Sequence, residues 1–204
     1  MKVTKEHVIA ILLACALASV LALLAVLENK NIKKLREKDY AIVNIKSAIN
    51  EPMVNSKYDF IDTMIAVYIE QLSIGSEVDP DLAFAILMVE NPQFDIYAMN
   101  RNDNGTIDEG LYQLNDRYFW TTFRNNYWKF EEIEPDPFNW KHNAFIAINH
   151  IAYLQNTLKV QEDVIMAYNC GIGAVLNNNI PPASKVYLAK VNNNLKLLKS
   201  IGEN

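Results

Sequence analysis

The arrangement of this chain follows from residues 79–115, which read DPDLAFAILMVENPQFDIYAMNRNDNGTIDEGLYQLN. The stretch opens with a helix start signal, because Asp79 supplies an N-cap acceptor and Pro80 suits the first helical position. Residues 81–90 are apolar on nearly every side, which is typical of a buried helix, and Pro92 ends it. We therefore expect a buried helix whose last residue is Glu90.

The second half of the stretch predicts a β-hairpin. Asn104-Gly105 is a strong short hairpin signal, and residues 96–99 and 106–107 would form the flanking strands. Asp108 and Glu109 follow the turn, so the hairpin brings two carboxylates with it.

A glycine and two amides come next. Gly110 allows another chain to approach the backbone closely, because it has no side chain. The amides of Gln113 and Asn115 both donate and accept hydrogen bonds, which suits N-acetyl groups and hydroxyls. Together with a carboxyl group at a helix end, these residues are typical of a cleft that binds sugars.

Glu90 is the candidate catalytic residue. Burial among apolar side chains disfavours the charged form of a carboxylate and raises its pKa. A carboxylic acid that is still protonated near neutral pH can give its proton to a leaving oxygen, as glycoside cleavage requires. Taken alone, such a glutamate is more often a solvated residue at a helix end. The polar residues that follow favour the catalytic interpretation.

A calcium loop is the competing interpretation of the hairpin. Asn100, Asn102, Asn104 and Gly105 match the first half of an EF-hand loop. The twelfth position, however, is Leu111 instead of the bidentate glutamate that completes such a site. No metal site or cofactor is therefore expected here. His142 and His150 also lack a nearby Cys or Asp to complete a ligand set, and we interpret both as ordinary polar positions.

The rest of the globular region is predicted to be helical. Apolar residues recur at helical spacing over 60–72 and 140–158, and again over 164–178 with a pause at Gly171 and Gly173. Pro181-Pro182 opens a last helix whose apolar stripe is Val186, Leu188, Val191, Leu195 and Leu198. The fold class expected is mainly α, with one small β-hairpin.

The N-terminus contains a candidate membrane anchor. Val8 to Leu27 is an uncharged run of twenty residues, which at about 1.5 Å rise per residue covers about 30 Å, the thickness of a bilayer core. A cleaved signal peptide is the alternative, and Cys15 loosely matches a lipoprotein processing site. We expect an uncleaved transmembrane anchor over 1–28, a polar stalk over 29–57 and the globular domain over 58–204.

Charge differs between these parts. Residues 1–57 carry nine Lys and Arg against five Asp and Glu, whereas residues 58–204 carry ten against nineteen. An acidic domain without basic clusters argues against nucleic acid as a partner. The basic residues 30–38 would favour the cytoplasmic side, although large domains cross membranes largely regardless of charge. Cys15 and Cys170 predict no disulfide scaffold, because one lies in the membrane segment.

Four motifs resemble the catalytic domains of lysozymes and soluble lytic transglycosylases. Glu90 begins the first, which continues through residues 100–117. Ala167-Tyr168-Asn169-Cys170-Gly171 resembles the Ala-Tyr-Asn-Ala-Gly signature of the transglycosylases. Residues 136–154 and 186–191 resemble the segment before the central helix and the closing Tyr-Val-x-Lys-Val segment. The resemblance spans residues 78–192.

This resemblance implies a lysozyme-like fold and cleavage of peptidoglycan between N-acetylmuramic acid and N-acetylglucosamine. Glu90 would act first as acid and then as base on the sugar's own 6-hydroxyl, which leaves a 1,6-anhydro end. By the resemblance, Gly110 and Gln113 shape the floor of the cleft, and Tyr168 and Asn169 lie close to Glu90 and orient it. Asn115 and Tyr187 complete the expected substrate-binding set.

Alternatives remain open at this point. Asp108 matches the second carboxylate of animal-type lysozymes, so a hydrolase (muramidase) that uses Glu90 and Asp108 is the first alternative. A non-catalytic peptidoglycan-binding protein of the same fold is the second, and a cytoplasm-facing membrane protein is the third. For the enzyme we expect a single-pass protein of the bacterial inner membrane with a periplasmic domain. Its setting could be wall remodelling, an envelope-spanning secretion or flagellar assembly, or phage lysis.

Overall fold

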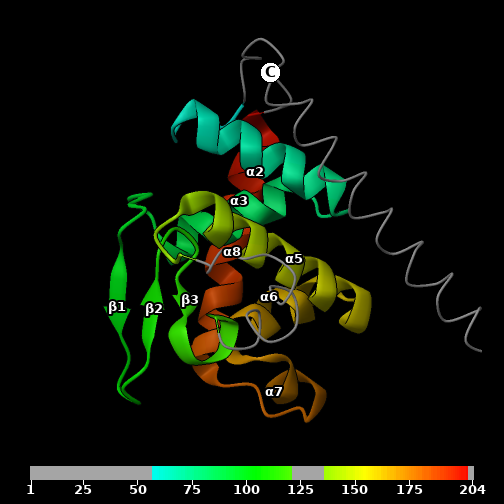
Figure 1. Ribbon diagram of the computed structural model, residues 1–204. Coiled ribbons are helices and arrows are strands. Elements are labelled where there is room, and N and C mark those ends of the chain that lie inside the picture. The colour runs from blue at the N-terminus through cyan, green and yellow to red at the C-terminus, as the bar shows by residue number, and fades with distance from the viewer. Residues whose placement is uncertain (1–56, 121–135, 202–204) are drawn as a thin grey trace, which may run out of the picture. The chain divides into compact units, whose positions relative to one another are not determined.

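A computed structural model of the chain describes residues 57–120 and 136–201 (Figure 1). All of them belong to one compact unit, Ala48–Asn204. The predicted membrane anchor and stalk lie outside the described residues and stay predictions. Among the helices that are described, none combines the length and the hydropathy that a membrane crossing needs.

The domain is mainly helical with one small sheet, as predicted (Figure 1). In Figure 1 the strands lie at one edge of the helical body. The elements, in chain order, are α2 (Thr63–Gly75), α3 (Pro80–Glu90), β1 (Met99–Arg101), β2 (Ile107–Glu109), β3 (Leu114–Asn115), the π-helical turn η1 (Asp116–Trp120), α5 (Trp140–Leu158), α6 (Gln161–Cys170), α7 (Ile172–Leu176) and α8 (Pro182–Ile201).

Helix α3 is the buried helix that its sequence predicts. Asp79 caps it, since its side chain accepts the Asp81 amide at 2.9 Å, and the residues from Leu82 to Leu87 are completely buried. The helix packs against α8 on one side and α2 on another. Beyond its end, the buried side chain of Asn91 bonds both backbone groups of Asp95, which fixes the turn after Glu90.

The predicted hairpin is wrong in its strand positions. The structure has a three-stranded antiparallel sheet in the order β1-β2-β3, in which Asn100 pairs with Asp108 and Asp108 with Asn115. The segment around Ile96 forms a turn instead of a strand, because the Asp95 side chain accepts the Tyr97 amide. β1 therefore begins later than expected, and the two-residue strand β3 was not expected at all.

The later helices agree with the sequence except in one detail. α5 has the predicted bounds, and Asn139 caps it. The pause expected at Gly171 within residues 164–178 is confirmed, since α6 and α7 separate at this glycine, where φ is +83°. In α8 the last three residues of the expected stripe, Val191, Leu195 and Leu198, are buried, but at its start Tyr187 is buried whereas Val186 is 58% exposed.

Candidate active site

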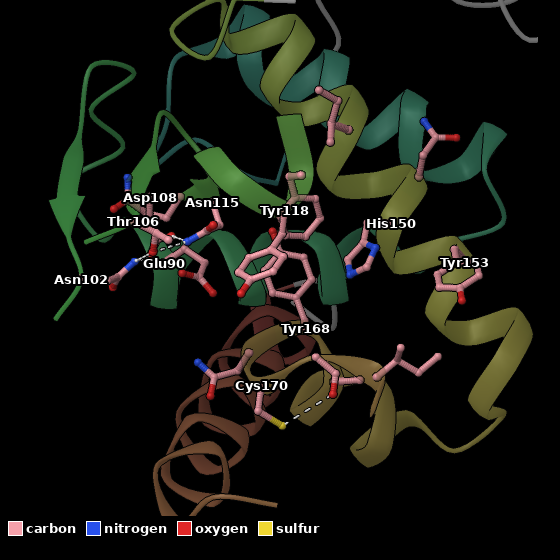
Figure 2. A pocket seen from close by; sticks show the side chains of 18 of the residues that line it. Glu90, Asn102, Thr106, Asp108, Asn115, Tyr118, His150, Tyr153, Tyr168 and Cys170 are labelled. Atoms are coloured by element: carbon pink, nitrogen blue, oxygen red, sulfur yellow. Dashed lines mark hydrogen bonds between the residues drawn. The ribbon is translucent and has the colours of Figure 1, made fainter. Parts of the chain in front are cut away.

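A cleft of about 900 Å³ lies between the sheet, the end of α3, α5 and the α6–α7 junction (Figure 2). One side, here named the amide wall, comes from the sheet and its turn: Asn102, Asn104, Thr106, Asp108 and Asn115. The other side, here named the aromatic wall, comes from η1 and α5: Tyr118, Phe119, His150 and Tyr153. In Figure 2, Glu90 lies next to the amide wall, with His150 and Tyr153 across the cleft.

Glu90 enters this cleft as the last residue of α3. Its Oε1 accepts a 2.6 Å hydrogen bond from the Tyr187 hydroxyl. Burial raises the pKa of Glu90 from 4.5 to about 7, the Tyr187 hydrogen bond lowers it, and the charge of Asp108 raises it. Within residues 57–120 and 136–201, no second hydrogen bond reaches this carboxyl group. Near neutral pH, Glu90 therefore has a proton to give, and its second oxygen accepts no hydrogen bond from the described residues.

Tyr187 is the residue that orients Glu90. It reaches the carboxyl group from α8, where its side chain is buried, and burial and the neighbouring Glu90 raise its own pKa well above the ordinary value. Because the phenol keeps its proton, it remains a hydrogen-bond donor over the whole working pH range. Tyr187 is not among the residues that line the cleft, and its hydroxyl contacts Glu90 instead. Its expected contact with the substrate stays a prediction.

Tyr168 and Asn169 line the cleft, but their hydrogen bonds go elsewhere. The Tyr168 hydroxyl donates to the carbonyl of Tyr112 at 3.3 Å, and Asn169 Oδ1 accepts from the Ser184 hydroxyl at 2.8 Å. Neither side chain has a hydrogen bond to Glu90 among those of the described residues. The orienting role expected of this pair does not run through a direct hydrogen bond among the described residues, and the role stays a prediction.

The amide wall is a closed hydrogen-bond network around Asp108. Its two carboxylate oxygens accept from Asn102 Nδ2 at 2.9 Å and from Asn115 Nδ2 at 2.7 Å. The Thr106 hydroxyl accepts from the same two amides, at 3.1 and 2.9 Å, and donates to Asn104 at 2.7 Å. Asn115 thus lines the cleft as expected, although its amide nitrogen is occupied by protein partners.

Gly110 and Gln113 hold the loop beneath this wall. A side chain at Gly110 would collide with the carbonyl of Pro137 and with Asn143, and its φ is +73°. Gln113 lines the cleft, and its Nε2 donates to the carbonyls of Gly110 at 2.9 Å and Ala98 at 3.2 Å. Gln113 is among the residues that line the cleft, whereas Gly110 is not.

Asn143 was missed by the sequence reasoning, and it joins α5 to this loop. Its Nδ2 donates to the carbonyls of Glu109 at 2.9 Å and Pro137 at 3.0 Å, and its Oδ1 accepts the Tyr112 amide at 2.7 Å. The side chain is completely buried. An asparagine between the buried residues of a predicted helix was the available signal, since buried amides need several partners.

His150 was also misjudged, because it is not an ordinary polar position. It lines the cleft from α5, with the Phe119 ring edge-on at 4.6 Å and the Tyr168 ring at 5.8 Å between centroids. Burial lowers its pKa to about 4, so the imidazole is neutral near pH 7. The available signal was spacing: Ile146, Asn149, His150 and Tyr153 follow the i, i+3, i+4, i+7 pattern of one helix face, and all four line the cleft.

Comparison with known proteins settles the family. The family model named Transglycosylase SLT domain matches residues 67–185, more than half of the chain. The chain belongs to the SLT transglycosylase family. No curated protein matches this chain. Membership assigns it a peptidoglycan-cleaving activity of the lytic transglycosylase type at the level of the family. The matched span contains Glu90 and every residue of both cleft walls.

Proposed function

We propose that this SLT transglycosylase cleaves the β-1,4 bond between N-acetylmuramic acid and N-acetylglucosamine, with Glu90 as its single acid and base, and leaves 1,6-anhydro ends. The observation that carries the proposal is the state of Glu90. Its carboxyl group opens into the cleft, one oxygen is held by Tyr187, and its pKa of about 7 keeps it substantially protonated at neutral pH. Few surface glutamates combine these properties.

The proposed reaction needs only this group. The proton of Glu90 passes to the bridging oxygen, the bond from that oxygen to the anomeric carbon breaks, and positive charge develops on the muramic acid ring. The ionised Glu90 then takes the proton of the 6-hydroxyl on the same ring as that oxygen bonds the anomeric carbon. Glu90 ends protonated again, and no water is consumed.

Asp108 is suited to support the charge on the sugar ring. Both of its oxygens accept an amide hydrogen bond, which fixes the orientation of the carboxylate. Its negative charge would stabilise the developing cation and already acts on the pKa of Glu90. The same position supports the second candidate, a muramidase in which Asp108 assists attack by water.

The products distinguish the two candidates. The full-length protein is incubated with purified peptidoglycan, and the released muropeptides are weighed by mass spectrometry. Anhydro ends, which are lighter by one water, are expected, and Glu90→Gln should release none. Reducing ends would replace the proposal with the muramidase. Tight binding without any product would replace it with the non-catalytic peptidoglycan-binding protein.

We also propose that the domain is held at the inner membrane by a single N-terminal span, with the catalytic cleft on the periplasmic side. The support is the apolar run from Val8 to Leu27 together with a substrate that lies outside the cytoplasm. A periplasm-dependent reporter fused to the C-terminus should be active. An inactive periplasmic fusion and an active cytoplasmic one would reverse the orientation.

A further inference from the structure

The aromatic wall contains a polar group that the proposed reaction does not use. His150 lies there between the rings of Phe119, Tyr153 and Tyr168. In Figure 2 its imidazole points from α5 into the cleft, across from Glu90. His150 is therefore part of the cleft surface, but it has no role in the proton transfer proposed for Glu90.

His150 has no hydrogen-bond partner in the described part of the chain, where its only recorded interactions are ring contacts. His142, on the same helix, differs, because its Nδ1 accepts the amide of Asp136 at 3.2 Å. The His150 side chain is half-buried and lines the cleft, so its ring nitrogens are open to a ligand group that hydrogen-bonds them. His150 can therefore form a hydrogen bond with a polar group of a ligand in the cleft.

The chemistry of that group follows from the charge of the imidazole. Because burial lowers the pKa of His150 to about 4, it presents one N–H donor and one ring-nitrogen acceptor near neutral pH. A secondary amide is the complement, since it has one carbonyl acceptor and one N–H donor. The apolar neighbours Ile146 and Phe119, which also line the cleft, suit the methyl group of an acetamide.

Exposed rings lie on the same wall. Tyr118 and Tyr153 line the cleft and are 61% and 51% exposed. Each offers an apolar face with a polar rim, the combination that suits a sugar ring. A neutral imidazole between such rings can hydrogen-bond a substituent of the sugar while the rings stack on the sugar ring.

We propose that His150 hydrogen-bonds the N-acetyl group of a glycan residue seated on the aromatic wall, and so sets the specificity of this cleft for N-acetylated sugars. The inference rests on the proposed function, because it assumes a glycan in the cleft. It adds a binding residue, on the opposite side of the cleft from Glu90, that acts on affinity and not on the chemical step.

Binding is measured on the full-length protein carrying Glu90→Gln, so that turnover does not interfere. Tri-N-acetylchitotriose is the probe, and cellotriose, which has a hydroxyl in place of each N-acetyl group, is its matched partner. We expect His150→Phe, which keeps a ring but no hydrogen bond, to weaken chitotriose binding about five- to thirtyfold. His150→Gln, which keeps a donor and an acceptor, should recover part of the loss. Asn156→Ala, at an exposed position on α5, should change nothing.

Selectivity decides the outcome. Preference for chitotriose over cellotriose that disappears in His150→Phe supports the proposal. Equal binding of both sugars by the parent protein, or unchanged preference in His150→Phe, overturns it. If His150→Phe does not fold, the ¹⁵N resonances of the imidazole in the parent protein give the answer, because chitotriose must shift them and cellotriose must not.

The same design separates this inference from the proposed function. If Glu90→Gln retains full activity while the His150 effect on binding is present, the proposed acid is wrong and the sugar subsite stands. If activity depends on Glu90 and His150→Phe changes neither KM nor selectivity, the subsite is wrong and the proposed function stands. A lowered kcat with unchanged KM would also contradict a role in binding.

Discussion

The two walls of the cleft differ in where their hydrogen bonds go. On the amide wall, Asp108 and the amide nitrogens of Asn102 and Asn115 bond one another or Thr106. On the aromatic wall, His150 has no such partner in the described part of the chain. The first wall therefore fixes the Asp108 carboxylate by hydrogen bonds within the protein, whereas the imidazole of the second wall is held by ring contacts alone in that part of the chain. Two polar residues that line the same cleft can thus differ in whether their hydrogen bonds are already made within the protein. The residue type alone does not show this difference.

The largest effect is expected from the group next to the amide wall. Glu90→Gln keeps the shape and removes the transferable proton, so the rate of muropeptide release should fall about a thousandfold or more. Glu162→Gln is the matched control, because the same change is made at an exposed position of α6. Equal rates of muropeptide release in the two variants would show that Glu90 is not the acid of the reaction.

Substitutions at two glycines test how the packing of the loop at Gly110 against α5 contributes to stability. Gly110→Ala should cost several kcal/mol, because the new methyl group meets the Pro137 carbonyl and Asn143 at a left-handed φ. Gly105→Ala has a similar φ of +80° but open space around it, so about 1 kcal/mol is expected. Chemical denaturation of both variants measures the difference. Similar losses of unfolding free energy in the two variants would mean that the close approach of α5 to this loop does not contribute to stability.

The burial of Glu90 should appear in the pH dependence of stability. Its pKa is raised from 4.5 to about 7 on folding, so the protonated form favours the folded state. This contribution is fully present below pH 4.5 and is lost as pH rises toward 7. Relative to the wild type, Glu90→Gln should therefore gain stability over that range, about 3 kcal/mol at pH 8. A constant difference from pH 4 to pH 8 would contradict the burial.

Two neighbours of Glu90 should move its titration in opposite directions. Tyr187→Phe removes a hydrogen bond that favours the ionised form, so the pKa of Glu90 should rise and activity should persist to higher pH. Asp108→Asn removes a like charge, so the pKa should fall and activity should be lost at lower pH. Each shift should be about one pH unit or less. Shifts of the same sign would contradict this account of the amide wall.

The sequence was most informative where local signals and burial agree. Helix α3 shows its cap, its proline and its apolar surface within twelve residues, and α5 has equally clear ends. The strands were misplaced because side chains of Asn91 and Asp95 set the turn before β1, and such local bonds leave little periodicity. The stripe of α8 was misread because Val186 and Tyr187 are adjacent, and only packing decides which of them turns inward.

In the site, too, local sequence patterns were informative and long-range contacts were not. Glu90, Asp108, Gln113, Asn115, Tyr168 and Asn169, expected from motifs, all line one cleft. Their partners could not be predicted, because bonds such as that of Tyr187 to Glu90 join helices that lie far apart in the sequence. Asn143 and His150 belong to the same long-range class, since their roles depend on what α5 meets across the fold.

The central claim is that Glu90 carries a proton near neutral pH in a cleft that accepts a glycan. Its most direct test is a titration of the Glu90 side-chain carboxyl carbon by ¹³C NMR, assigned by comparison with Glu90→Gln. The account predicts a midpoint near pH 7, well above the ordinary value of 4.5. A midpoint near 4.5 would show a solvated carboxylate and would contradict Glu90 as the acid.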